Sequence, residues 1–296
     1  MRKLIFLTIM AGAAACSQGD KADKATPEVQ SATEEVAVEP GDSIRLYAFD
    51  GGHIEMNDLS IFTQGDEYDG RQNSAIDMCF LIRHPKGDLM WDAGMPAALH
   101  DVEGGVTNGP FHVSVPTTIA SQLASIGVTT AGVDYFSISH SHFDHIGDAN
   151  QFSGAKFLVD SDERAFMFSD DARADAEGFA NYSALEGADT IEFDGDFDVF
   201  GDSTVTILDM PGHTPGHKAL LLQLDKTGPV LLSGDLYHLQ ESREKRLVPK
   251  FNTNVEDTFA SMDRFEQIAK DTGARVIIQH VKADYDALPH APEYLD

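Results

Sequence analysis

The run at 139–148 concentrates side chains that can bind metal ions. It reads S-H-S-H-F-D-H-I-G-D, and its pattern H-x-H-x-D-H offers four candidate ligands: His140, His142, Asp144 and His145. A strand over the apolar residues 135–138 would turn His140 and His142 to one face, because alternate strand residues share a face. Imidazole nitrogen and carboxylate oxygen at this density suit zinc, or a similar divalent ion, at two neighbouring positions. A histidine-rich surface turn is the alternative interpretation.

Three further ligand candidates also follow apolar, strand-like segments. They are His213 after 205–208, Asp235 after 230–232, and His280 after 275–279. Because a buried sheet delivers side chains from its strand ends to a common edge, the repeated placement predicts one shared site. His217 lies in the same Pro- and Gly-rich turn as His213, and spacing alone does not choose between them.

These motifs resemble the metallo-β-lactamase superfamily and, within it, the N-acyl-homoserine lactonase family. The resemblance runs from about Ile44 to His280 and includes L-M-W-D-A-G at 89–94, which is similar to the superfamily strand that ends in Asp-x-Gly. It implies an α/β fold, an αββα sandwich of two mixed sheets flanked by helices. It also implies two divalent metal ions, with zinc favoured, and it assigns their ligands. One ion would be held by His140, His142 and His213, the other by Asp144, His145 and His280, with Asp235 bridging both.

The chemistry implied by such a pair of ions is the opening of a lactone ring. Two cations that share a water molecule lower its pKa, so hydroxide can attack an ester or lactone carbonyl near neutral pH. Asp144 or water could supply a proton to the leaving oxygen. Tyr237 is the candidate donor to the substrate carbonyl, and a core or rim tyrosine is the alternative. In the lactonase family the corresponding tyrosine sits three residues after the bridging Asp, where this chain has His238.

The charge of the chain narrows the choice of partner. Acidic residues outnumber basic ones 49 to 21, and the formal net charge is −28. Such a surface repels polyphosphate backbones, which argues against a nucleic-acid partner. A neutral, partly apolar small molecule suits this negatively charged surface better. The stretch 51–71 resembles the lactonase substrate loop, and its apolar residues could line a pocket for an acyl chain: Ile54, Met56, Leu59, Ile61 and Phe62.

Other activities of the superfamily remain alternatives. Metallo-β-lactamases either place Cys at the bridging position or lack its carboxylate, whereas this chain has Asp235. Hydrolysis of another ester, lactone or phosphotriester would use the same metals, and a non-catalytic ligand-binding descendant is a third possibility. N-acyl-homoserine lactones are the substrates that the resemblance favours.

The first 42 residues predict export. A basic pair at 2–3, an apolar stretch at 4–10 and small residues at 11–15 form a signal peptide, 1–15, too short for a permanent membrane helix. Ala13-Ala14-Ala15-Cys16 resembles a lipobox, with simple cleavage after A-x-A as the alternative. Residues 16–42 have no aromatic side chain and predict a flexible tether. We therefore expect a periplasmic or outer-membrane-anchored bacterial lipoprotein whose membrane contact is Cys16, with a catalytic domain at 43–296.

The remaining pattern is that of a mixed α/β domain. Strands are predicted at 44–49, 78–83, 89–91, 135–139, 156–159, 203–208, 218–224, 229–232 and 275–279, and helices at 117–126, 162–168 and 255–271. Residues 84–88 read as a hairpin turn. The stripe Val255, Phe259, Met262, Phe265 and Ile268 predicts a helix face in the core. Cys79 reads as a core residue, and Asp92 could orient a ligating imidazole.

Overall fold

The computed structural model describes residues 43–296. The predicted signal peptide 1–15, the tether 16–42 and the lipidation site Cys16 lie outside these residues and stay predictions. Within 43–296, no helix is both long and apolar enough to cross a membrane.

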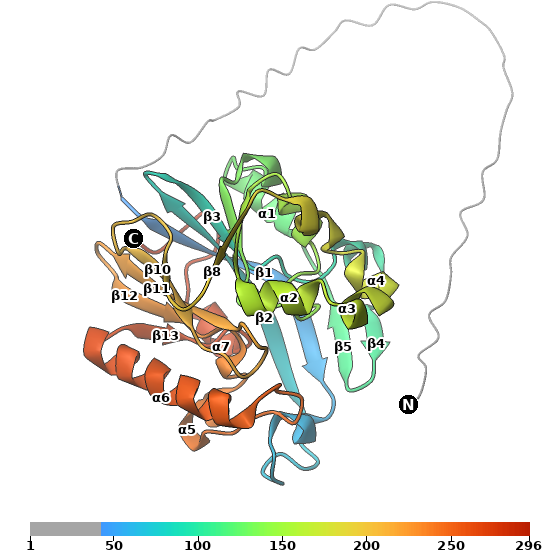
Figure 1. Cartoon of the computed structure of the whole chain (residues 1–296). Helices are drawn as coiled ribbons and strands as arrows, with labels where there is room; N and C mark the ends of the chain where they lie inside the picture. The colour runs from blue at the N-terminus through green and yellow to red at the C-terminus, as the bar shows by residue number, and fades with distance from the viewer. Residues whose placement is uncertain (1–42) are drawn as a thin grey trace, which may run out of the picture. The chain divides into compact units, whose positions relative to one another are not determined.

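Two mixed sheets form the centre of the domain (Figure 1). The larger sheet has the strand order β4-β5-β1-β2-β3-β6-β7-β8, and the smaller has β13-β12-β11-β10-β9. Their bounds are β1 Arg45–Met56, β2 Asn73–His84, β3 Gly87–Trp91, β4 Val106–Asn108, β5 Phe111–Ser114, β6 Tyr135–Ser137, β7 Lys156–Asp160, β8 Thr190–Phe193, β9 Phe197–Asp198, β10 Val205–Asp209, β11 Lys218–Leu224, β12 Gly228–Leu232 and β13 Arg275–Ile277. All nine predicted strands are present, and β4, β5, β8 and β9 come in addition.

The helices are mostly short and surround the sheets. The α-helices are α1 Ile119–Ser125, α2 Ser161–Met167, α3 Asp170–Ala174, α4 Ala176–Phe179, α5 Gln240–Lys245, α6 Val255–Thr272 and α7 Lys282–Asp286. The 3-10 helices are η1 Leu59–Phe62, η2 Ala97–Asp101, η3 Thr130–Gly132, η4 Ala149–Phe152, η5 Ser183–Gly187 and η6 Gly234–Leu236. The three predicted helices correspond to α1, α2 and α6. The predicted αββα class is confirmed.

Successive side chains of a strand point to opposite faces of the sheet, and this divides the core into layers. On β2, Met78 and Phe80 share an apolar cluster with residues of both sheets, including Leu220 of β11. Their neighbours Cys79 and Leu81 belong to a second cluster, which contains residues of α1 and α2. Residues 78–82 of β2 are buried on both faces, which explains the continuous apolar run in this part of the strand. Cys79 is fully buried, as predicted.

Helix α6 covers the outer face of the smaller sheet (Figure 1). It starts at Asn254, whose side chain accepts hydrogen bonds from the N–H groups of Glu256 and Asp257, and it ends at Gly273 in a left-handed conformation. Met262 and Phe265 are buried against the sheet. The predicted stripe is wrong at Phe259, which is 38% exposed because this position of the helix lies beyond the edge of the packed face.

The strand pairings place the predicted ligands at one end of both sheets. β2 and β3 form the predicted antiparallel hairpin, whose turn is Pro85-Lys86. β3, β6 and β7 then run parallel, as do β12 and β13 in the smaller sheet. The residues that follow β3, β6, β12 and β13 therefore emerge at the carboxyl ends of neighbouring strands. Such ends are where α/β sheets commonly bind ligands.

Candidate metal centre

The structure brings all seven predicted ligands together from four loops. The loop after β6 carries His140, His142, Asp144 and His145, and the loops after β10, β12 and β13 carry His213, Asp235 and His280. Six of the seven are buried, and His142 is half-buried. Burial lowers the pKa of His140 and of His213 well below the usual value, so these imidazoles stay neutral and keep a lone pair for a metal.

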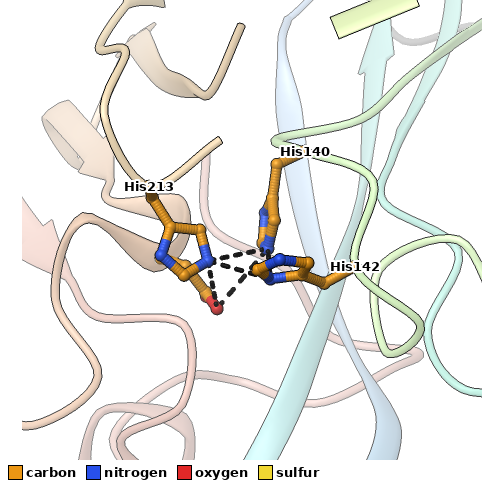
Figure 2. A group of neighbouring side chains, drawn as sticks. His140, His142 and His213 are labelled. Atoms are coloured by element: carbon orange, nitrogen blue, oxygen red, sulfur yellow. Dashed lines mark hydrogen bonds and ion pairs between the residues drawn. The ribbon is translucent and has the colours of Figure 1, made fainter. Parts of the chain in front are cut away.

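Three imidazoles converge at the first position (Figure 2). His140 Nε2 lies 2.9 Å from His142 Nδ1, and His213 Nε2 lies 3.2 and 3.0 Å from these two atoms. Asp235 Oδ2 lies 3.6 Å from His140 Nε2 and 3.5 Å from His213 Nε2. Ligand atoms of a tetrahedral zinc ion are about 3.3–3.6 Å apart, given bonds of about 2.0–2.2 Å. The four atoms are therefore spaced to hold one such ion.

A second group lies on the other side of Asp235. Asp235 Oδ1 is 3.0 Å from His280 Nε2 and 3.4 Å from His145 Nε2. Asp144 Oδ2 is 3.7 Å from His280 Nε2 and 3.9 Å from His145 Nε2. Because one oxygen of Asp235 faces each group, its carboxylate can bridge two ions.

The state of these buried atoms fits metal binding. His145 Nε2 and Asp235 Oδ1 have no hydrogen-bond partner within the described residues, although both are buried. A buried polar atom without a partner costs about 1–3 kcal/mol, and coordination to an ion would remove that cost. Burial by itself would raise the pKa of Asp235, but the imidazoles of His280 and His145 outweigh it and hold the pKa well below its usual range. Asp235 is therefore anionic, as a carboxylate that bridges two cations would have to be.

Asp92 connects two of the ligand-bearing segments, the loop after β6 and the segment after β13. Its carboxylate accepts hydrogen bonds from Ser139 N–H at 2.6 Å, Ser139 Oγ at 2.9 Å, His145 Nδ1 at 3.1 Å and Gln279 Nε2 at 2.6 Å. The bond to Nδ1 leaves His145 Nε2 free to face the metal position. The φ of Asp92 is 62°, a left-handed value that costs a non-glycine residue energy and that persists here because four donors hold the carboxylate. The predicted orienting role of Asp92 fits this geometry.

His217 lies outside both ligand groups and instead holds the backbone of Asp235 in place. Its Nε2 accepts the backbone N–H of Asp235 at 2.9 Å, and its Nδ1 donates to the Met210 carbonyl at 2.9 Å. An accepting Nε2 requires a neutral ring, and burial lowers the pKa of His217 to about 4. Gly234 is needed beside it, because its φ is 52° and a Cβ there would lie 2.6 Å from His217 Nε2.

Two further residues hold the metal ligands in place and were not predicted from the sequence. Glu163 accepts hydrogen bonds from Ser141 N–H at 2.7 Å and from Gly216 N–H at 3.1 Å, so it ties the loop after β6 to the loop after β10. Asn252 Oδ1 lies 2.9 Å from His213 Nδ1 and directs Nε2 of that ring to the first position. Neither residue lies near a ligand in the sequence, and no local pattern marks them.

The structure does not bring Tyr237 to the site, which corrects its predicted role as carbonyl donor. Its hydroxyl donates to Glu266 Oε1 at 3.1 Å, and its ring packs in the cluster beneath α6. His238 faces the site instead, with its Nε2 3.1 Å from Asp235 Oδ2. The 3-10 turn ends at Leu236 and Tyr237 has an extended backbone, so Tyr237 and His238 point to opposite sides of the chain and only His238 reaches Asp235.

An apolar cavity of about 550 Å³ opens onto the second group and His238. Polar residues of the centre form part of its lining: His142, Asp144, Asp235, His238 and His280. Its other walls are largely apolar: Ile54, Met56, Ile61, Phe62, Pro110, Phe111, Phe143 and Phe251, with Lys250 beside them. Four residues of the predicted substrate loop thus face the cavity. The fifth, Leu59, is buried in a core cluster and does not.

Asp77 is a buried carboxylate beside the second group that the sequence analysis did not single out. One ligand atom each of Asp77, Asp144, His145 and His280 lies within 4.8 Å of the others. The available signal was a single acidic residue in the otherwise apolar run 75–82. Charged residues are almost never fully buried without a partner.

Comparisons with known proteins agree with this geometry. The sequence profile of the Metallo-beta-lactamase superfamily matches residues 77–280. The N-acyl homoserine lactonase AttM of Azorhizobium caulinodans is 29% identical over 266 residues, which covers 86% of this chain and 99% of the relative. The N-acyl homoserine lactonase AiiA of Bacillus thuringiensis subsp. kurstaki is 26% identical over 224 residues, covering 73% of this chain and 86% of the relative.

Solved structures share the fold. A structure of an N-acyl homoserine lactone hydrolase, with the product N-hexanoyl-L-homoserine at its catalytic metal centre, superposes with a TM-score of 0.72 at 24% identity and covers 86% of this chain and 100% of that chain. The dizinc quorum-quenching lactonase AidC gives a TM-score of 0.60 at 17% identity, with coverage of 81% and 88%. The matched profile spans both ligand groups and the strands that position them, and this chain belongs to the metallo-beta-lactamase superfamily.

Proposed function

We propose that this protein is a metal-dependent hydrolase that opens the ring of N-acyl-homoserine lactones. The observation that carries the proposal is a pair of ligand groups that share Asp235 and border an apolar cavity. The lactonase names of the relatives support the choice of substrate. Two divalent ions, for which Zn²⁺ is our candidate, would polarise the lactone carbonyl and acidify a water molecule when bound.

The cavity suits a substrate with a polar head and an apolar tail. Its volume of about 550 Å³ lies within the roughly 300–1,000 Å³ typical of small-molecule sites. The lactone ring would lie against the metal ligands, and the acyl chain would contact Ile54, Ile61 and Phe62. Burial of the chain supplies binding energy at roughly 25 cal/mol per Å² of apolar surface.

Asp144 and His238 are the polar side chains that we assign to the reaction. Ring opening adds a water oxygen to the carbonyl carbon, breaks the ring C–O bond and leaves an alkoxide that needs a proton. Asp144 lines the cavity and is 7% exposed, so its carboxylate can take the proton that the attacking water releases and pass it to the leaving oxygen. His238 lines the cavity next to Asp235, and we assign it the hydrogen bond to the substrate carbonyl that Tyr237 cannot reach.

A substrate panel tests the proposal. Purified, metal-loaded protein is given an N-acyl-homoserine lactone, a simple γ-lactone, an aryl ester, a β-lactam and paraoxon, and kcat/KM is measured for each. We expect the acyl-homoserine lactone to have the highest kcat/KM, because it alone combines a lactone ring with an acyl chain for the cavity. A higher value for the β-lactam or for paraoxon would reject the assigned substrate class.

Export of the protein is a separate part of the proposal and rests on residues 1–42 alone. We infer that 1–15 is removed and that Cys16 carries lipid, which would tether the enzyme to a bacterial membrane outside the cytoplasm. Metabolic labelling with a radioactive fatty acid should mark the wild-type chain and leave Cys16→Ser unlabelled. Equal labelling of both would reject the anchor.

A further inference from the structure

We propose that Asp77 is a ligand of the second metal ion, in addition to Asp144, His145, His280 and the shared Asp235. The inference rests on the metal centre of the proposed function. Asp77 lies on β2, at the position that pairs with Gly52 of β1. It is fully buried, and neither of its carboxylate oxygens has a hydrogen-bond partner within the described residues.

A buried carboxylate without a partner is strongly unfavourable. Moving an ionised carboxylate out of water costs several kcal/mol even after relaxation, so buried charges are paired or coordinate metals. No Lys or Arg of residues 43–296 forms an ion pair with Asp77. Its neighbours are the imidazoles of His145 and His280. The Nδ1 atom of each ring is already hydrogen-bonded to another group. His145 Nδ1 contacts Asp92, and His280 Nδ1 contacts the Ile76 carbonyl at 3.0 Å.

The distances allow Asp77 to reach the same ion. One ligand atom each of Asp77, Asp144, His145 and His280 lies within 4.8 Å of all the others. Two atoms bound to one ion at about 2.1 Å can be at most about 4.2 Å apart, so small side-chain rotations bring the four atoms onto one centre. With Asp235 Oδ1, the second position would have five protein ligands, against four at the first position.

The backbone around Asp77 leaves room for its carboxylate. β1 has a register shift between Asp50 and Gly52, which places the extra residue Gly51 opposite Asp77. A Cβ at Gly51 would lie 2.9 Å from Asp77 Oδ2 and 2.8 Å from Cys79 Sγ. Bulges of this kind are common next to active sites, where they redirect a side chain. Gly51 therefore clears the space that the carboxylate occupies beside His145 and His280.

The consequence is a second position richer in carboxylate oxygen than the first. Asp77, Asp144 and Asp235 would give it three carboxylates, whereas the first position has three imidazoles and Asp235 alone. Oxygen ligands favour harder cations, so the two positions would differ in their metal preference. The first would retain zinc, and the second would also accept Mn²⁺.

The test compares metal binding by the full chain and its variants. Metal-stripped wild type, Asp77→Asn and the control Asp88→Asn are titrated with Zn²⁺ against a chromophoric chelator, and the absorption spectrum of bound Co²⁺ is recorded. Asp88 is a carboxylate on the neighbouring strand β3 and pairs with Arg83 at 3.1 Å, away from the ligand groups. We expect Asp77→Asn to bind one of the two ions at least roughly tenfold more weakly and to alter the Co²⁺ spectrum, and Asp88→Asn to do neither.

Thermal unfolding of the metal-free proteins separates coordination from a structural role. Metal-free Asp77→Asn should unfold at about the same temperature as wild type, because the amide has the size of the carboxyl group and Asp77 makes no side-chain hydrogen bond that would be lost. If Asp77→Asn does not fold, Asp77→Val takes its place, since Val has a similar shape and favours strands.

Unchanged affinity for both ions together with an unchanged Co²⁺ spectrum would overturn the inference. A wild-type chain that binds no ion would overturn the metal centre as well. A chain that binds two ions but opens no lactone would contradict only the proposed substrate.

Discussion

Separate substitutions of two neighbouring residues, Tyr237 and His238, test which of them contacts the substrate in the cavity. Tyr237→Phe removes one hydroxyl whose partner, Glu266, also accepts two bonds from Arg243 at 2.8 and 2.9 Å. The loss should therefore be about 1 kcal/mol of unfolding free energy, or about 2–4 °C in Tm. Because this hydroxyl points away from the cavity, kcat/KM should stay within roughly twofold of wild type.

His238→Phe should behave in the opposite way. The ring still packs near Phe62, whose centroid lies 4.8 Å from that of His238, but the N–H beside Asp235 is gone. Removing one hydrogen bond to the substrate carbonyl should lower kcat/KM by roughly 10- to 100-fold, about 1.4–2.7 kcal/mol, since the metals still stabilise the oxygen. Both variants are assayed for ring opening by pH-stat titration and for Tm by calorimetry. A large loss of kcat/KM in Tyr237→Phe, together with near-normal kcat/KM in His238→Phe, would refute the reasoning.

Further variants test the centre and the cavity. Asp235→Asn should lower kcat/KM by at least roughly 100-fold, because it removes the charge shared by both ions; near-normal turnover would reject the bridge. Asp92→Asn should weaken metal binding by roughly 10- to 100-fold in a chelator competition, since it disturbs the orientation of His145. Ile61→Ala should raise KM for a long-chain lactone by roughly five- to tenfold with little change in kcat, as about 1 kcal/mol of apolar contact is lost; equal KM values would place the acyl chain elsewhere. Removal of metal by EDTA should lower Tm, because ions at 100 times their Kd stabilise the fold by about 2.7 kcal/mol each, and an unchanged Tm would show that no ion was bound.

The ligand residues could be predicted from the sequence because their physical signals are local. His140, His142 and His145 lie in one short motif directly after an apolar strand, and Asp235 and His280 each follow another. Strand ends that meet at one sheet edge are a general property of α/β folds, so separate motifs could be assigned to one site. The αββα class was implied by the family resemblance, and the order of the apolar segments fits it.

Asp77, Glu163 and Asn252 could not be assigned in this way because their roles depend on tertiary contacts. Asp77 lies within an apolar strand, and only the pairing of β1 with β2 and the bulge at Gly51 turn its carboxylate toward His145.

The error at Tyr237 has a different cause. Its distance along the chain from Asp235 was known, but the direction of its side chain was not. Tyr237 follows the 3-10 turn in an extended conformation, in which successive residues point to opposite sides, so one position decides between the core and the cavity. The strands β4 and β9 are short and depend on their partners, so sequence pattern alone did not identify them.

In the proposed mechanism, lactone hydrolysis requires two ions that act together. The decisive measurement is a titration of metal-stripped full-length protein with Zn²⁺, in which bound metal and the rate of N-acyl-homoserine lactone opening are followed in the same samples. We predict negligible turnover without metal and a maximum at about two bound ions per chain, as expected for two ligand groups that share Asp235. Full activity at no more than one bound ion, or turnover that persists without metal, would contradict the dinuclear account.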